Sequence, residues 1–179
     1  MGWAVSDGMT LTTFGGIDAS GATVGKIWKL NLQTHEWASQ LYRSNRFIRR
    51  GAVVSMVGPG RFIVIGGDDT TSWALQQPAA PNLLIDLAED RQIGLGFPAG
   101  SGRIGMVSVT LPVVKGKVRV VVIGGFGRFK GLDFTAATAL SDAYTLDTPT
   151  SGAAAISWQE RTNGPQPIAR GFAVGRQAS

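Results

Sequence analysis

The sequence contains no cysteine and only one histidine. Without cysteine there is no disulfide framework, no thiolate nucleophile and no thiol metal site, and this absence favours a reducing, cytoplasmic compartment. The single histidine, His35, lies in an expected turn between two strands, which suits neither a Ser-His-Asp triad nor a multi-histidine metal site. We therefore expect no catalytic residue, no metal and no cofactor, and we interpret the chain as a non-enzyme.

Long apolar runs and dense charge are also missing. The longest apolar stretch, Val120 to Ile123 with its flanks, is far shorter than the ~20 residues of a membrane helix. The first residues, Met1 to Asp7, have neither the basic leader nor the apolar segment of a secretory signal. These features predict a soluble protein without a membrane span.

Glycine is abundant instead, with 25 residues that recur between short runs of valine, isoleucine and leucine. This pattern is typical of an all-β protein with tight turns. Three apolar runs each end in a glycine pair, and the pairs are Gly15-Gly16, Gly66-Gly67 and Gly124-Gly125. Their spacing is close to the ~50 residues of one blade-sized repeat, so we place repeats at 11–60, 61–111 and 118–175.

Each glycine pair is followed by a polar loop and a second strand. The second strands are expected at 27–30, 83–87 and 143–147, and further strands begin near Arg50, Arg103 and Arg170. Large aromatic side chains recur in the first copy, as Trp28 and Trp37, and in the third copy, as Tyr144 and Trp158. The second copy has Ile93 where Trp37 and Trp158 stand in the other two. We expect these rings to fill the space between adjacent sheets, and Asp86 and Asp147 to cap turns.

These residues resemble the kelch family, more narrowly the fungal kelch-repeat proteins related to the galactose-oxidase propeller superfamily. The ending carries the resemblance most clearly, with Trp158-Gln159-Glu160, Thr162 to Pro167, and Arg170-Gly171-Phe172. The resemblance implies a β-propeller segment of about three four-stranded antiparallel blades. A galactose-oxidase copper site would require histidine and tyrosine ligands and a tyrosine–cysteine cross-link, which this composition does not provide.

Three blades are fewer than the four to eight that close a propeller. An open arc leaves two blade faces exposed to water or to another chain. We therefore interpret the chain as a fragment, a truncated product, or a protein completed by a partner, with self-association through the open blade edges as one outcome.

Loops on a rigid scaffold are where binding residues usually lie. The candidates that follow the glycine pairs are Asp18, Asp68, Asp69, Arg128, Phe129 and Lys130. A basic stretch between the first two repeats adds Arg43, Arg46 and Arg49, interleaved with aromatic residues. The leading hypothesis is a non-catalytic module that binds a protein partner through these loops. The alternatives are a fragment of a propeller enzyme whose catalytic residues lie elsewhere, and nucleic-acid binding by the basic stretch, which we consider less favoured.

Overall fold

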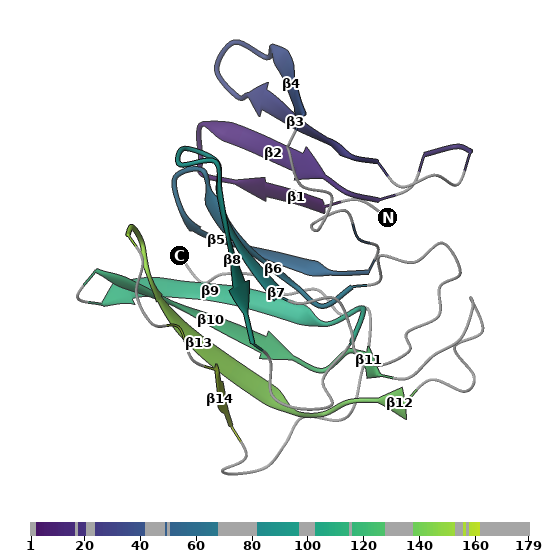
Figure 1. The fold of residues 1–179 in the computed structure, drawn as a ribbon, viewed down its shortest axis with the longest axis vertical. Helices are drawn as coiled ribbons and strands as arrows, with labels where there is room; N and C mark the ends of the chain where they lie inside the picture. Colours follow the sequence, from purple (N-terminus) through teal and green to yellow (C-terminus); the bar gives the residue numbers. More distant parts are fainter. Residues whose placement is uncertain are drawn as a thin grey trace.

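The structure of this chain is a computed structural model built of β-strands and turns (Figure 1). It describes residues 3–16, 18–20, 24–41, 49, 51–67, 82–96, 103–114, 116–127, 138–152, 156 and 158–161. No helix occurs among these residues, so none of them belongs to a helix that could cross a membrane.

Most strands belong to three four-stranded antiparallel sheets, which we call blades 1, 2 and 3. Blade 1 consists of β1 (Trp3–Ser6), β2 (Thr10–Phe14), β3 (Lys26–Asn31) and β4 (Trp37–Leu41). Blade 2 consists of β5 (Val53–Gly58), β6 (Arg61–Ile65), β7 (Asn82–Asp86) and β8 (Arg91–Leu95). Blade 3 consists of β9 (Val107–Val114), β10 (Lys117–Ile123), β13 (Ala143–Pro149) and β14 (Trp158–Glu160). A small ribbon of β11 (Phe126–Gly127) and β12 (Thr138–Ala139) follows the last glycine pair.

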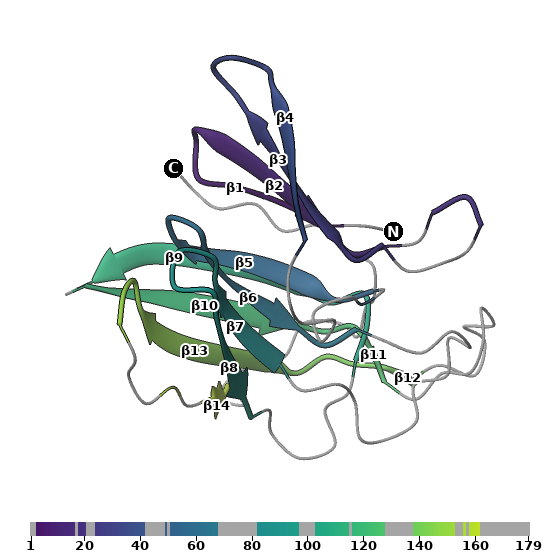
Figure 2. The same ribbon diagram turned by 45° about the horizontal axis from the view of Figure 1, so that its top comes forward.

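The burial of each blade follows its place in the stack. Blade 2 lies between the other two blades in both views (Figures 1 and 2). All five residues of β6 are buried accordingly, so this strand reads as a continuous apolar run after its first residue. In β10 buried and more exposed residues alternate, because only one of its faces is covered by blade 2.

Two apolar layers form the core, one on each side of blade 2. Between blades 1 and 2, Phe14 stacks on Phe62 with ring centroids 4.9 Å apart, and Ile27 and Ile85 are fully buried in the same cluster. Between blades 2 and 3 the layer contains buried side chains from β6, β7, β10 and β13. Successive blades therefore bury their apolar residues against one another.

The first strands of successive blades lie next to one another. Strand β5 contacts both β1 and β9, and the Ser55 hydroxyl donates to the Ser108 hydroxyl oxygen at 2.7 Å. The Thr110 hydroxyl also donates to the Met56 carbonyl at 3.2 Å. Placing the first strands together, with the other strands fanning outward, is the arrangement of propeller blades. Across the described residues the three blades form an open arc, as the sequence predicted.

The glycine pairs end β2, β6 and β10, and the strands predicted at 27–30, 83–87 and 143–147 correspond to β3, β7 and β13. The predicted repeats and the sheets differ in phase by one strand. Strand β5 falls at the end of repeat 11–60, yet it is the first strand of blade 2. Hydrogen bonding, which the repeat spacing does not encode, joins this strand to the following glycine-pair strand.

Candidate functional site

The loops predicted to bind a partner begin at the glycine pairs. Of the nine candidate residues, the structure describes Asp18 and Arg49. The other seven candidates lie outside the described residues, and these candidates are Asp68, Asp69, Arg128, Phe129, Lys130, Arg43 and Arg46. The landmark arginines Arg50 and Arg170 also lie outside the described residues.

Asp18 is exposed in the loop that follows Gly16. Its carboxylate accepts hydrogen bonds from the backbone N–H of Ser20 at 2.9 Å and from the Ser20 hydroxyl at 2.5 Å. These short-range bonds shape an Asx turn at the surface. Asp18 therefore helps to set the conformation of the loop in which it is displayed.

Arg49 is buried, and this overturns its predicted place on a basic, partner-binding surface. Its guanidinium donates to the Gly66 carbonyl at 3.0 Å, while its own carbonyl accepts the Gly16 N–H at 3.4 Å. One arginine thus connects the glycine pair of blade 1 with the glycine pair of blade 2. A buried guanidinium needs hydrogen-bond acceptors around it, and the Gly66 carbonyl is one of them, so Arg49 has a structural role.

Arg103 repeats the same arrangement one blade further along. Its guanidinium donates to the Gly124 carbonyl at 3.1 Å, and its carbonyl accepts the Gly67 N–H at 2.9 Å. Arg103 also makes two bonds to the Asp142 carboxylate, at 2.5 and 2.9 Å, and lies 5.2 Å from the centre of the Tyr144 ring. Such fork-like pairing is characteristic of arginine and carboxylate.

The environment of Arg103 also affects Tyr144. Burial of the phenol raises the pKa of Tyr144 above its ordinary value, and the negative charges of Asp142 and Glu160 raise it further. The positive charge of Arg103 opposes this change. The tyrosine hydroxyl is therefore held in its neutral form inside the blade.

The segments that lead into blades 2 and 3 share a three-residue pattern of arginine, any residue and glycine. The pattern is Arg49-Arg50-Gly51 before blade 2 and Arg103-Ile104-Gly105 before blade 3, and both glycines have positive φ, +65° and +62°. Arg50, the landmark predicted for the first case, stands directly before its glycine. The arginine two positions before the glycine, equivalent to Arg103, is Arg49.

The aromatic landmarks occupy equivalent positions in blades 1 and 3. Trp28 and Tyr144 lie opposite Thr13 and Val122, and Trp37 and Trp158 lie opposite Leu30 and Leu146. Tyr144 is buried and Trp158 packs against the core, whereas Trp28 and Trp37 remain 39% and 55% exposed. The rings of blade 3 thus lie between sheets, and those of blade 1 face away from blade 2.

A hollow of about 290 Å³ lies at the glycine end of blade 1. Trp3, Gly15, Val24, Lys26 and Trp28 are among its lining residues, and the Lys26 ammonium lies 5.9 Å from the centre of the Trp28 ring. No group of three histidine, cysteine, aspartate or glutamate side chains placed to hold a metal occurs in the described part of the chain.

His35 and the two predicted capping aspartates have local roles. His35 adopts a φ of +59° in the β3–β4 turn and donates its backbone N–H to the Asn31 carbonyl at 2.9 Å. Asp86 accepts the N–H groups of Ala88 and Glu89, so it caps a turn as expected. Asp147 lies within β13 instead, where Arg119 donates to both of its carboxylate oxygens at 2.6 Å.

Comparison with known proteins supports the fold. No protein-family model matches the sequence, and no curated protein does. Among solved structures, the chain is similar to YjhT, with a TM-score of 0.62 and 16% identity over 94% of this chain. This similarity shows a β-propeller-like fold, and the chain spans 53% of the length of YjhT.

Proposed function

We propose that this chain is a non-catalytic interaction module of kelch-like repeats, which binds a protein partner through the loops that follow Gly16, Gly67 and Gly125. The observation that carries the proposal is that these loops begin side by side. The Arg49 carbonyl and guanidinium join Gly16 to Gly66, and those of Arg103 join Gly67 to Gly124. Three loops therefore start from one rim of the arc.

The loops at this rim are the candidate binding surface because the buried side chains between the blades hold the blades together. Arg49 and Arg103 are buried and have that structural role. A rigid base with variable loops is the usual arrangement in binding proteins, since the scaffold fixes the loop ends and the loops supply the contacts. The candidate contacts combine Asp68 and Asp69 with Arg128 and Lys130, a mixture of charges suited to a polar protein surface.

A charge-removing variant tests this proposal. The loop variant carries alanine at Asp68, Asp69, Arg128 and Lys130, which removes two negative and two positive charges. The control carries alanine at Glu89 and Arg91, and it likewise leaves the net charge unchanged. Both control residues are exposed and lie beside the β7–β8 turn, at the strand ends opposite the glycine pair of blade 2. Each protein is used in affinity capture with quantitative mass spectrometry, after circular dichroism has verified its fold.

The proposal expects one or more proteins to be retained by the wild type and by the control, and lost by the loop variant. If no captured protein distinguishes the loop variant from the control, the loops are not the binding surface. The burial of Arg49 removes one charge from the basic stretch, which weakens the nucleic-acid alternative. That alternative requires affinity for nucleic acid that falls steeply with salt.

A further inference from the structure

The outer faces of the first and last described blades correspond to faces that are buried between blades elsewhere in the arc. We call the side of a blade toward the preceding blade its rear face, and the side toward the next blade its forward face. The rear face of blade 1 consists of Leu11, Thr13, Trp28, Leu30 and Trp37, which share one side of the sheet by their register. The forward face of blade 3 consists of Arg119, Val121, Ile123, Thr145 and Asp147.

The rear face of blade 1 has the composition of an interface. Counting from the glycine pairs, Leu11 corresponds to Phe62 and Val120, and both of those residues are fully buried against the preceding blade. By strand register, Leu30 corresponds to Ile85 and Leu146, which are buried in the same way. Blade 1 thus carries apolar side chains on its rear face, at the positions where blades 2 and 3 bury apolar side chains against the preceding blade.

Trp37 shows most clearly that the rear face of blade 1 is less covered than the rear face of blade 3. Its counterpart in blade 3 is Trp158, which packs against the core between blades 2 and 3, whereas Trp37 remains 55% exposed. A tryptophan buries a large area when a partner covers it, and such residues dominate the energetics of interfaces. The position therefore lacks a neighbouring sheet among the described residues.

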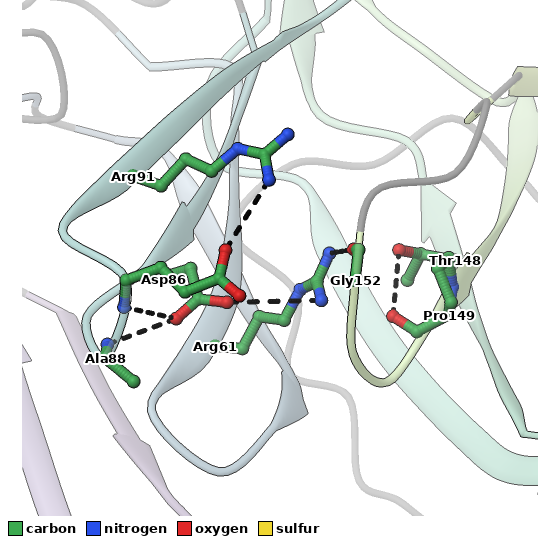
Figure 3. A network of polar contacts seen from close by, with 8 residues as sticks. Arg61, Asp86, Ala88, Arg91, Thr148, Pro149 and Gly152 are labelled. Atoms are coloured by element: carbon green, nitrogen blue, oxygen red, sulfur yellow. Dashed lines mark hydrogen bonds and ion pairs between the residues drawn. The ribbon is translucent and has the colours of Figure 1, made fainter.

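The forward face of blade 3 carries an arginine–aspartate pair that is more exposed than the corresponding pair in blade 2. In blade 2, Arg61 lies beside Asp86 at 4.0 Å and donates to the Gly152 carbonyl of blade 3 at 2.6 Å (Figure 3). Arg119 and Asp147 form the corresponding pair in blade 3. The side chains of Arg61 and Asp86 are 4% and 16% exposed, and those of Arg119 and Asp147 are 46% and 43% exposed.

We propose that a second copy of this chain covers both faces, with the forward face of blade 3 in each copy packed on the rear face of blade 1 in the other. The two faces are the two halves of the interface that already occurs twice inside the chain, so each copy carries the surface that the other needs. The described blades of two copies number six, within the four to eight that close a propeller.

Each contact joins two different faces, and a twofold axis relates the two contacts, so the ring closes with two copies. In this ring Arg119 donates to a carbonyl of the partner's β3–β4 turn, residues 32–36, as Arg61 donates to Gly152 in the β13–β14 loop of blade 3. This arrangement is independent of the loops of the proposed function.

Light scattering coupled to size-exclusion chromatography tests the arrangement. We expect the wild type to elute with twice the mass of one chain. Trp37→Glu on blade 1 and Val121→Glu on blade 3 should each raise the dimer dissociation constant by at least about tenfold, because each places a charge in the apolar contact. The matched control is Ala38→Glu, since Ala38 is an exposed neighbour of Trp37 whose side chain lies on the opposite face. Circular dichroism verifies that each variant is folded, and Arg119→Ala replaces Val121→Glu if that variant does not fold.

Mixing the two variants gives the sharpest result. In a ring of one Trp37→Glu chain and one Val121→Glu chain, one of the two contacts is unmodified, so the mixture should contain a dimer that neither variant forms alone. A wild type that remains a monomer at micromolar concentrations would overturn the proposal, and so would masses that grow beyond two copies. A dimer broken by Trp37→Glu but not by the blade 3 variants would indicate blade 1 packed on blade 1, which also contradicts it.

Discussion

Buried arginine side chains hold the blades of this protein together. A guanidinium stays charged at any pH in the physiological range and has five N–H donors in a planar fork. Arg103 uses this fork to reach the Gly124 carbonyl and both Asp142 oxygens at once. A lysine at this position has a single ammonium and cannot reproduce that geometry.

Replacing Arg103 with methionine should lower the free energy of unfolding by about 3 kcal/mol, because the Gly124 carbonyl and the Asp142 carboxylate lose their charged donor. Urea denaturation followed by tryptophan fluorescence measures the change. The control is Arg91→Met, which removes an exposed pair with Glu89 at 3.5 Å and should cost less than about 0.5 kcal/mol. Equal losses in the two variants would show that Arg103 is no more important than a surface arginine.

The raised pKa of Tyr144 predicts a loss of stability in alkaline solution. The folded protein binds the phenol proton more tightly than the unfolded chain, whose tyrosine has the ordinary pKa of 10.0. The stabilisation is therefore fully present below pH 10 and is lost as the pH rises through the pKa of the folded state. Urea unfolding at a series of pH values around 10 should show a steeper decline for the wild type than for Tyr144→Phe. Parallel curves would mean that Tyr144 ionises equally in both states.

At the scale of the element, the glycine pair of blade 2 lets its backbone lie close to the segments that lead into β5 and β9. Gly67 has a φ of +88°, and a Cβ there would lie 2.7 Å from the Cβ of Ala52. At Gly66 an added Cβ would overlap the Arg103 carbonyl oxygen and the Met106 side chain. The pair is therefore required both by the backbone conformation and by close packing.

Gly67→Ala should destabilise the protein by about 3 kcal/mol, since the new methyl group meets Ala52 in addition to imposing backbone strain. Gly116→Ala is the matched control. Gly116 also has a positive φ, +72°, but an added Cβ would find no atom within 4 Å, so that change should cost only about 1 kcal/mol. Thermal and urea unfolding measure both. A similar loss at the two sites would exclude close packing as the reason for the glycine pair.

The sequence predicted the strands well because their apolar runs end in recurring glycine pairs, and this signal is local. It was less informative where pairing across the sheet decides the position of a side chain. Ile93 was expected at the tryptophan position of the second copy, but the register of β7 and β8 places Gln92 opposite Ile85, as Trp37 lies opposite Leu30. Arg49 was predicted at the surface for the same reason, because its partner, Gly66, lies 17 residues away in the chain.

At the scale of the whole molecule, the three blades have unequal surroundings. Blade 2 is covered on both faces by apolar layers, whereas among the described residues blades 1 and 3 each pack against one neighbouring blade. Stability in such a stack comes from each blade and from its contacts with adjacent blades. The end blades therefore depend more strongly on any surface that covers them from outside.

Hydrogen exchange should reveal this inequality. The amides of β6 and β7 should exchange most slowly, because both strands are hydrogen-bonded on two sides and are almost entirely buried. The amides of β4 should exchange at least about tenfold faster, since β4 is the edge strand of its described sheet and is hydrogen-bonded on one side, to β3. Mass spectrometry of peptides from each strand measures the rates. In the two-copy ring proposed above, Trp37→Glu should accelerate exchange in blades 1 and 3, whose outer faces the second copy covers, while leaving β6 and β7 unchanged, because apolar layers of the same chain cover blade 2 on both sides. Uniform rates across the three blades would instead mean that the arc opens as one cooperative unit.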